Sequence, residues 1–474
     1  MLSPHFFFRL FMEFIALGDT DDVAASCHFV RIHNTGLVLD AGVDPRRDGR
    51  ASLPNFDIIH SHRDRYVNHA LITHAHHDHL GGLPVLVQEF PNVVAHMTEA
   101  THLLAEMLLP ASARLQRRQR EEGTTDADPL FTEDEAELYQ QLYLTHQLQQ
   151  TFDVTGHSPT PVKARFYDAG HILGSVGVAL QFEEEGQTRD VFYTSDTNVK
   201  PQSIIAGASY PNSTDVLILE STLGSDPEAE QTTRGLETKR FTELLQRTLK
   251  RGGTALIPVF VMGRAQEMIA VLGQLKRQGK IPDDVPIYTA GSMRGVADIY
   301  DRTRNNTPRL DSDFRVFGVS QERLPYSDSG LREALKEPSI MVVSSGMMFE
   351  PTLSNRLGRR LIEDEKNAVL LVGYSKEDTP ARRLLDAAAE GPGTEVVLSE
   401  ARGPQPVRCA VERFRFSGHS NRRELLDIVA TLSPDTVVLV HGEPAARAWM
   451  QEQIEERHPT VTVHKPDGGE VLTL

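Results

Sequence analysis

Four histidines and one aspartate crowd into six consecutive residues of this chain of 474 residues. These side chains are His74, His76, His77, Asp78 and His79. An apolar strand precedes them and a glycine pair follows, so they lie within a folded pattern rather than in a tail. Such crowding is costly unless a cation organises it, and imidazole and carboxylate both suit zinc. A loop after a strand can turn His74 and His76 one way and Asp78 and His79 another, which predicts two metal ions.

Three distant segments supply further ligand types at the ends of predicted strands. His171 lies in a turn after the strand ARFY, Asp196 closes the strand DVFY, and His441 closes TVVLV. Sites of α/β proteins are assembled from polar residues at strand ends. Taken singly, each of these residues could equally be a satisfied turn residue. Together with the histidine cluster, they predict one composite metal site.

The elements that must position these residues change character along the chain. Residues 13–100 read as successive strands, followed by helices over 99–150, where Thr132 and Glu135 predict a capping box for a helix over 132–152. Strands resume up to residue 222, and regular strand and helix alternation over 223–394 predicts a parallel sheet with helices on both faces. Strands return near 395. We therefore expect one discontinuous domain, 1–222 and 395–474, interrupted by a second α/β domain, 223–394.

Composition limits the functional classes. The 49 Lys and Arg against 66 Asp and Glu give a formal charge of -17, so binding of a polyanion requires a local positive feature. The two cysteines, Cys27 and Cys409, are too few for a thiolate zinc site or a disulfide framework, which predicts a reducing, cytoplasmic setting. The apolar N-terminus is too short to span a bilayer and lacks a signal cleavage site, so no membrane association is expected. Met1 and Met12 both remain candidate start residues.

The motifs, taken in order, resemble those of a known superfamily. HAHHDH at 74–79, AGHILGS at 169–175, TSD at 194–196 and LVLDAG at 37–42 resemble the metallo-β-lactamase superfamily. Five further segments resemble its β-CASP branch of nucleases: ESTLG at 220–224, PVFVMGRAQEM at 258–268, SSGMM at 344–348, FSGHS at 416–420 and LVHGE at 439–443. The resemblance implies an α/β fold, a metallo-β-lactamase αββα sandwich with an inserted β-CASP domain built on a parallel sheet.

The resemblance also implies roles for single residues. One zinc would be bound by His74, His76 and His171, the other by Asp78, His79 and His441, with Asp196 bridging the two. Asp40 is expected to lie behind the ligands and orient the histidine loop, and His77 to be a partly exposed spacer. His419 is the candidate general acid or phosphate contact, oriented by Glu220, although Glu220 could instead cap the next helix. Catalysis is thus expected from Asp78, Asp196, His419 and Glu220.

The implied activity is that of a zinc-dependent ribonuclease, which hydrolyses RNA phosphodiester bonds with a hydroxide activated by two metal ions. RNA-acting members of the branch generally have histidine at the position matched by His441. Arg264, Arg382 and Arg383 are candidate RNA-binding residues, because guanidinium groups bind phosphate well. The sequence departs from the family pattern at 348–351 and 378–382, so endonuclease or 5′-exonuclease action and end preference stay open.

Three other functions compete with this hypothesis. A small-molecule metallo-hydrolase would explain the histidine cluster but not the inserted domain, and a nuclease directed at DNA would keep the same metal site. A non-catalytic RNA-binding subunit would normally have lost metal ligands, whereas this chain retains all seven candidates. A homodimer is compatible with the sequence, which has no feature that requires one.

Overall fold

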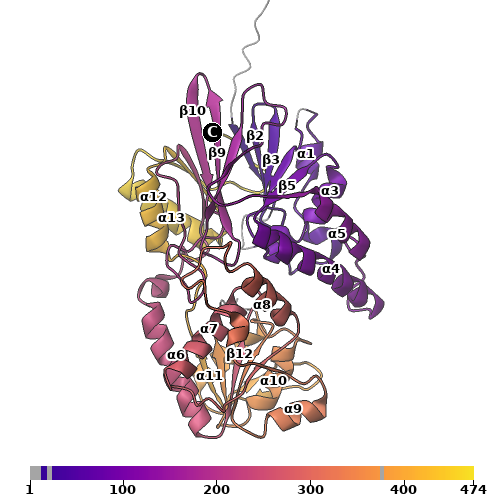
Figure 1. Ribbon diagram of the computed structural model, residues 1–474, viewed down its shortest axis with the longest axis vertical. Helices are drawn as coiled ribbons and strands as arrows, with labels where there is room; N and C mark the ends of the chain where they lie inside the picture. The colour runs from indigo at the N-terminus through magenta and orange to yellow at the C-terminus, as the bar shows by residue number, and fades with distance from the viewer. Residues whose placement is uncertain (1–11, 19–23, 64, 374–377) are drawn as a thin grey trace, which may run out of the picture. The chain divides into compact units, whose positions relative to one another are not determined.

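The computed structural model describes residues 12–18, 24–63, 65–373 and 378–474, which fold into two compact units (Figure 1). The first unit comprises the residues up to Lys200 together with Gly207–Pro227 and His419–Leu474. The second comprises Pro201–Ala206 and Glu228–Gly418. The choice between Met1 and Met12 as the start falls on residues 1–11, outside the described residues. None of the described helices is both long and apolar enough to cross a bilayer.

The first unit contains two seven-stranded sheets. The first sheet has the order β22 (Val471–Thr473), β1 (Met12–Ala16), β2 (His28–Ile32), β3 (Thr35–Leu39), β4 (His69–Leu71), β5 (Val94–Met97) and β6 (Tyr143–Thr145). The second has the order β21 (Thr462–His464), β20 (Thr436–Val440), β11 (Val216–Glu220), β10 (Gln187–Tyr193), β9 (Val176–Glu184), β8 (Lys163–Asp168) and β7 (Thr151–Asp153). Alternate residues of the strands face each other across a shared core, for example Phe14 and Leu39 of one sheet with Phe166 and Ile218 of the other.

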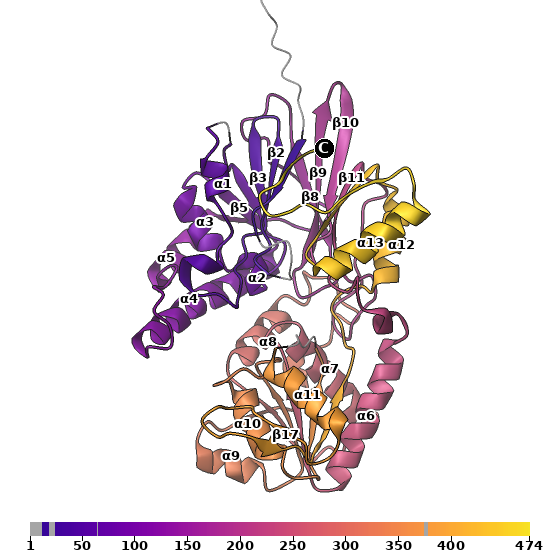
Figure 2. The same cartoon turned by 180° about the vertical axis from the view of Figure 1, so that it is seen from behind.

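Helices cover the outer face of each sheet, as the two views of Figures 1 and 2 show. Those on the first sheet are α1 (Asp57–His60), α2 (His77–Leu80), α3 (Leu83–Glu89), α4 (Glu99–Glu121) and α5 (Glu133–Tyr139), with the 3-10 turns η1 (Gly49–Ser52) and η2 (Gln140–Leu142). The second sheet is covered by α12 (Arg422–Leu432) and α13 (Pro444–Arg457), whose Leu425 and Met450 pack against Leu217 and Leu439. The unit is therefore an αββα sandwich, which confirms the predicted fold class.

The second unit is built on a six-stranded sheet in which every pair is parallel. Its order is β14 (Glu322–Arg323), β13 (Ile287–Thr289), β15 (Ser339–Val343), β12 (Thr254–Pro258), β16 (Ala368–Leu371) and β19 (Ala410–Arg413), with a separate pair β17 (Glu395–Val396) and β18 (Gln405–Pro406). Its helices are α6 (Arg234–Lys250), α7 (Arg264–Arg277), α8 (Ser292–Arg302), α9 (Asp328–Ala334), α10 (Leu353–Leu361) and α11 (Pro380–Glu390), and η3 (Pro227–Glu230) and η4 (Val316–Gly318) are 3-10 turns.

Buried residues line both faces of this parallel sheet. Leu256 and Val343 pack with Leu357 of α10 and Leu384 of α11. Their strand neighbours, such as Ile257, are also 0% exposed and point to the opposite face. A strand buried on both faces needs a continuous apolar sequence, which is how TALIP and SIMVV read.

Two predictions of element and boundary differ from the structure. The capping box of Thr132 and Glu135 is present, but the helix ends at Tyr139 instead of continuing to 152. Residues Tyr143–Thr145 form β6 and pair in parallel with β5, so tertiary pairing overrides the helical pattern there. The second unit extends to Gly418 rather than 394. The strands expected to return to the first domain near 395 stay in the second unit, because β19 pairs with β16.

Candidate metal centre

The histidine loop starts where the short strand β4 ends, between β3 and β5 in the first sheet. The backbone nitrogen of Thr73 donates a hydrogen bond to Oδ1 of Asp40 at 2.8 Å, and the Thr73 hydroxyl donates to the same oxygen at 2.8 Å. The chain then turns into α2, which carries Asp78 and His79. His77 points outward and is exposed, in agreement with its expected role as a spacer.

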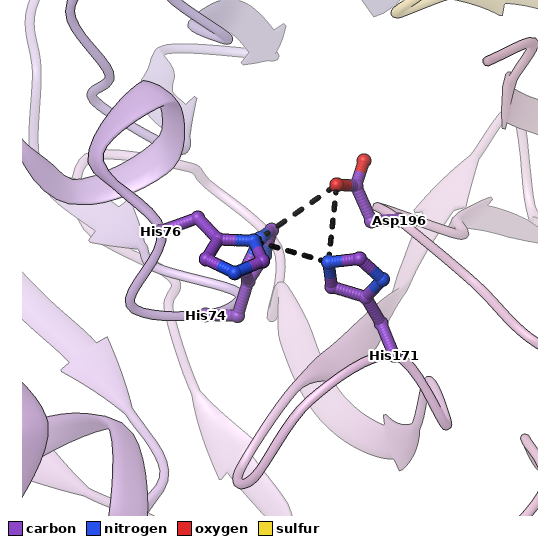
Figure 3. Close-up of side chains that lie close together, drawn as sticks. All are labelled: His74, His76, His171 and Asp196. Carbon is purple, nitrogen blue, oxygen red and sulfur yellow. Dashed lines mark hydrogen bonds and ion pairs between the residues drawn. The ribbon is translucent and has the colours of Figure 1, made fainter. Parts of the chain in front are cut away.

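One group of potential ligands consists of His74, His76, His171 and Asp196, whose candidate ligand atoms all lie within 4.8 Å of one another. Figure 3 shows these side chains pointing toward one another. Nδ1 of His76 lies 3.2 Å from Nε2 of His74 and 3.1 Å from Nε2 of His171. Oδ2 of Asp196 lies 3.7 Å from Nε2 of His74 and 3.5 Å from Nε2 of His171. The structure thus brings together the residues that the resemblance assigned to one ion.

A second group consists of Asp78, His79 and His441. Nε2 of His79 lies 3.3 Å from Nε2 of His441, which in turn lies 3.6 Å from Oδ2 of Asp78. Oδ1 of Asp196 lies 3.5 Å from Nε2 of His79 and 3.0 Å from Nδ1 of His441. Asp196 therefore presents one carboxylate oxygen to each group, which is the geometry of a bridging residue.

Both groups have the chemistry that a divalent cation requires. Burial lowers the pKa of His74 and of His76, so these rings are neutral and offer lone pairs. Oδ1 of Asp196 is buried and has no hydrogen-bond partner among the described residues. Burial opposes ionisation of Asp196, but His441 and His79 outweigh it and hold its pKa well below the usual range. The neutral imidazoles of His74 and His76, beside a buried and ionised carboxylate whose Oδ1 accepts no hydrogen bond from the described residues, fit a bound cation.

His79 differs from the other imidazoles. Burial alone would lower its pKa, but the carboxylates of Asp196, Asp40 and Asp78 raise it to about 10. A cation bound at Nε2 would take the place of that proton and relieve the same negative charge. The Nδ1 hydrogen is donated to Oδ2 of Asp40 at 2.8 Å, so Asp40 lies behind the ligands and fixes the orientation of the ring.

The backbone at this centre is held in an uncommon conformation. Asp40, Ser195 and His441 have φ of 62°, 51° and 49°, in the left-handed region that non-glycine residues seldom adopt. Asp40 directly follows β3, His441 directly follows β20, and Ser195 lies two residues after the end of β10, so each is at the end of a strand beside the centre. The strain marks the three strand ends that build the site.

His419 and Glu220 form a third group beside Asp196. The Nδ1 hydrogen of His419 is donated to the Glu220 carboxylate, with distances of 3.2 and 3.3 Å to its two oxygens. Glu220 also accepts hydrogen bonds from the backbone nitrogens of Thr197 and Thr222. The carboxylate thus orients His419 and also holds the turn after β11. The alternative reading, that Glu220 caps the next helix, is wrong, because Thr233 is the N-cap of α6.

The three candidate RNA-binding arginines lie in the second unit and differ in exposure. Arg264 is 9% exposed, and burial followed by the neighbouring Arg234 lowers its pKa to about 10. Arg382 donates to Asp386 at 2.8 Å, whereas Arg383 is exposed. Their roles in RNA binding stay predictions.

Two residues that contact a candidate ligand or Asp40 behind the ligands were not identified from the sequence. The hydroxyl of Thr222 lies 3.1 Å from Nδ1 of His441, and the hydroxyl of Tyr193 donates to Asp40 at 3.0 Å. Their only signal in the sequence is position, because Thr222 follows β11 and Tyr193 ends β10 beside the TSD motif. Only the tertiary structure brings the Thr222 hydroxyl to His441 and the Tyr193 hydroxyl to Asp40.

Comparison with known proteins covers most of the chain. Residues 20–195 match the metallo-beta-lactamase superfamily, residues 265–384 the Beta-Casp domain, and residues 404–466 the Zn-dependent metallo-hydrolase RNA specificity domain. A crystal structure of a protein of unknown function from Enterococcus faecalis V583 has a similar fold, with a TM-score of 0.57 and 14% identity over 98% of this chain and 100% of that one.

Named relatives align over nearly the same span. Endoribonuclease YSH1 of Candida glabrata is 31% identical over 91% of this chain and 55% of its own length. Cleavage and polyadenylation specificity factor subunit 3 of Dictyostelium discoideum is 28% identical over 98% of this chain and 57% of its own. The chain therefore spans about half the length of these relatives. With three family matches in the order of the motifs, the chain belongs to the β-CASP branch of the metallo-β-lactamase superfamily.

Proposed function

We propose that the chain is a zinc-dependent ribonuclease that cleaves internal phosphodiester bonds of RNA at the centre in its first unit. The observation that carries the proposal is the pair of ligand groups with Asp196 close to both, as a member of the first and at 3.0 Å from Nδ1 of His441 in the second. The names of the relatives, endoribonuclease and cleavage factor subunit, support an RNA substrate and endonucleolytic cleavage. So does the match of residues 404–466 to an RNA specificity domain, because this segment contains His419 and His441.

Zinc is the metal that the donor set favours. Four-coordinate sites rich in imidazole, completed by carboxylate oxygen, are typical of zinc, whereas magnesium and calcium prefer oxygen ligands alone. Two ions per chain correspond to the two groups, with Asp196 common to both. When bound, such ions neutralise charge on a phosphate and lower the pKa of water toward about 7.

The chain's own residues supply the remaining requirements of hydrolysis. The leaving ribose oxygen needs a proton, and the His419 imidazole is a suitable donor. Nδ1 of His419 donates to Glu220, and we assign the proton transfer to Nε2. The His171 and His419 rings lie 4.5 Å apart between centroids, so this donor is next to the first ligand group. Asp40 keeps His79 in the tautomer whose Nε2 faces His441.

The alternatives lack comparable support. A small-molecule hydrolase accounts for the metal centre but not for the Beta-Casp match, and a DNA-directed enzyme does not account for the RNA specificity match. A non-catalytic subunit does not explain why all seven candidate ligands are present and gathered in the two ligand groups.

The test uses purified full-length chain, its metal content, and labelled RNA in linear and circular forms. We expect about two zinc ions per chain and cleavage of circular RNA, which has no end for an exonuclease. Removal of metal by a chelator should abolish cleavage, and zinc should restore it. Metal-replete protein that cleaves neither form of RNA, while an Asp78→Asn control behaves identically, would refute the proposed activity.

A further inference from the structure

Asp40 is the acceptor at the centre of a buried hydrogen-bond network. Its Oδ2 accepts from Nδ1 of His79 at 2.8 Å and from the hydroxyl of Tyr193 at 3.0 Å. Thr73 donates to Oδ1 through its backbone nitrogen and its hydroxyl, each at 2.8 Å. Asp40 and His79 are 0% exposed and Tyr193 is 1% exposed. Hydrogen bonds in such an interior are stronger than at the surface, and losing one leaves a buried group poorly satisfied.

The direction of each hydrogen bond in the network is fixed by Asp40. An ionised carboxylate can only accept, so the Tyr193 hydroxyl must donate its single hydrogen to Asp40. The Tyr193 oxygen can then accept from the hydroxyl of Ser26, which lies 3.3 Å away. By the same rule, the hydroxyl of Thr73 donates to Asp40 and accepts from that of Ser195 at 2.7 Å. Hydroxyl hydrogens from Tyr193 of β10 and from Thr73 in the loop after β4 therefore point toward one carboxylate.

This arrangement determines which nitrogen of His79 is available as a ligand. Nδ1 donates to Asp40, so the lone pair is on Nε2, which faces His441 at 3.3 Å. Oδ2 of Asp40 is held between His79 of α2 and Tyr193 of β10, and the Thr73 hydroxyl lies 2.9 Å from the same oxygen. Without the Tyr193 hydroxyl, Oδ2 loses one of its donors and the carboxylate can turn toward Thr73. The ring of His79 would then lose its fixed orientation.

We propose that Tyr193 is a positioning residue for the ligand group of Asp78, His79 and His441, and that it acts through Asp40. The inference rests on the metal-binding part of the proposed function. Tyr193 touches none of the three ligands in its role. Tyr193 orients the Asp40 carboxylate, and that carboxylate orients the ring of His79. In the chain, Tyr193 stands three residues before Asp196.

The first experiment is Tyr193→Phe in the full-length chain, with metal affinity as the readout. Phenylalanine keeps the ring, which packs edge-on against His28 at 5.6 Å, and removes only the hydroxyl. We expect zinc binding to the Asp78 group to weaken about 10-fold or more, and binding to the His74 group to be unchanged. Competition with a chelator measures both affinities, and the absorption spectrum of bound Co²⁺ reports distortion of one site.

Tyr167→Phe is the matched control. Tyr167 lies in the neighbouring part of the same sheet, its ring meets Phe192 edge-on, and its hydroxyl forms no hydrogen bond among the described residues. This variant should bind both metal ions with wild-type affinity. A double-mutant cycle then tests whether Tyr193 acts through Asp40. In an Asp40→Ala background, Tyr193→Phe should cause no further loss of zinc affinity.

Four outcomes would overturn the inference. They are wild-type affinity in Tyr193→Phe, equal loss at both ligand groups, a lower Tm with unchanged metal affinity, and a wild-type chain that binds no zinc. RNA cleavage is not among the readouts. A chain that binds zinc as expected but cleaves no RNA would therefore refute the proposed activity and leave the role of Tyr193 standing.

Discussion

Both carboxylate oxygens of Glu220 lie within hydrogen-bond distance of Nδ1 of His419, at 3.2 and 3.3 Å. Glu220 ends β11 and is 0% exposed, whereas His419 is the residue at which the chain returns to the first unit. The two are separated by 199 positions in sequence. A buried carboxylate that fixes Nδ1 of a partly exposed imidazole makes Nε2 the nitrogen for proton transfer, and two predictions depend on this pair.

His419→Ala should retain zinc but lose most of its turnover. General acid catalysis contributes about 10²- to 10⁴-fold to rate, so we expect kcat to fall within that range while metal content stays at the wild-type level. Single-turnover cleavage of labelled RNA and elemental analysis measure the two quantities. His62→Ala, at an exposed position in the same unit, is the control and should change neither. A His419→Ala enzyme that cleaves at the wild-type rate would remove His419 from the mechanism.

Glu220→Gln tests whether the carboxylate acts through His419. The amide keeps the shape but offers only one acceptor oxygen to His419 and to the backbone nitrogens of Thr197 and Thr222. We expect a loss of turnover smaller than that of His419→Ala, and no additional loss when the two changes are combined, because residues that act as a unit are not additive. Independent, additive losses in the double variant would instead assign Glu220 a structural role alone.

Asp78→Asn should empty one ligand group and leave the other. Replacing the carboxylate by an amide removes the negative charge that faces His441 and His79, so we expect about one zinc per chain and a loss of cleavage of 10²-fold or more. The remaining ion should be the one held by the His74 group, whose residues the substitution does not touch. Two tightly bound ions in the variant, or undiminished cleavage, would contradict the two-ion assignment.

The candidate ligands could be selected from the sequence because they cluster or follow apolar strands, and the structure places each of them in the group that the resemblance implies. What the sequence could not supply is contact between distant backbones. Asp40 and His441 adopt left-handed backbone conformations because the chain turns at the ends of β3 and β20. Aspartate and histidine as residue types do not require that conformation. The sequence predicts the return to the first unit at 395, whereas the structure has it at His419, because TEVVLS and PVRCAVERF read as strands of either domain. Only pairing of β19 with β16 decides it.

Acid should destabilise the first unit through a row of histidines outside the metal centre. Nε2 of His96 lies 3.0 Å from Nδ1 of His69, and its Nδ1 lies 2.8 Å from Nε2 of His146. Burial, then the neighbouring His69 and His146, lower the pKa of His96 to about 3. The unfolded chain, with a histidine pKa of about 6.5, therefore binds the proton first, and stability present above pH 6.5 is lost as the pH falls toward 3.

His96→Gln should weaken this pH dependence. Between pH 7 and 5, the free energy of unfolding of the wild type should fall more steeply than that of the variant, by at most about 1.4 kcal/mol per pH unit. Urea titrations at several pH values measure the slopes, and the difference between the two proteins separates His96 from the histidines of the metal centre. The exposed His62→Gln serves as the control. Equal slopes for His96→Gln and the wild type would show that His96 is not the titrating group.

Gly42→Ala should displace the ligand loop, because the backbone of Gly42 packs directly against it. A Cβ built on Gly42 would lie 1.7 Å from the backbone oxygen of Asp78, a distance that forces one of the two segments to move. That oxygen also accepts from the backbone nitrogen of Ser26 at 2.7 Å, so the loop has little freedom to yield. We expect a lower Tm, with about 1 to 3 kcal/mol less free energy of unfolding, and weaker zinc binding to the Asp78 group.

Gly235→Ala separates this effect from a general cost of replacing glycine. Gly235 lies in α6, and a Cβ there meets no atom of the described residues within 4 Å. Alanine favours a helix by up to about 1 kcal/mol relative to glycine, so this variant should be as stable as the wild type or more so, with unchanged zinc content. Thermal unfolding and metal analysis of both variants provide the comparison. If Gly42→Ala matched the wild type in thermal stability and in zinc binding, the close approach of the Gly42 backbone to Asp78 would not be needed to form the centre.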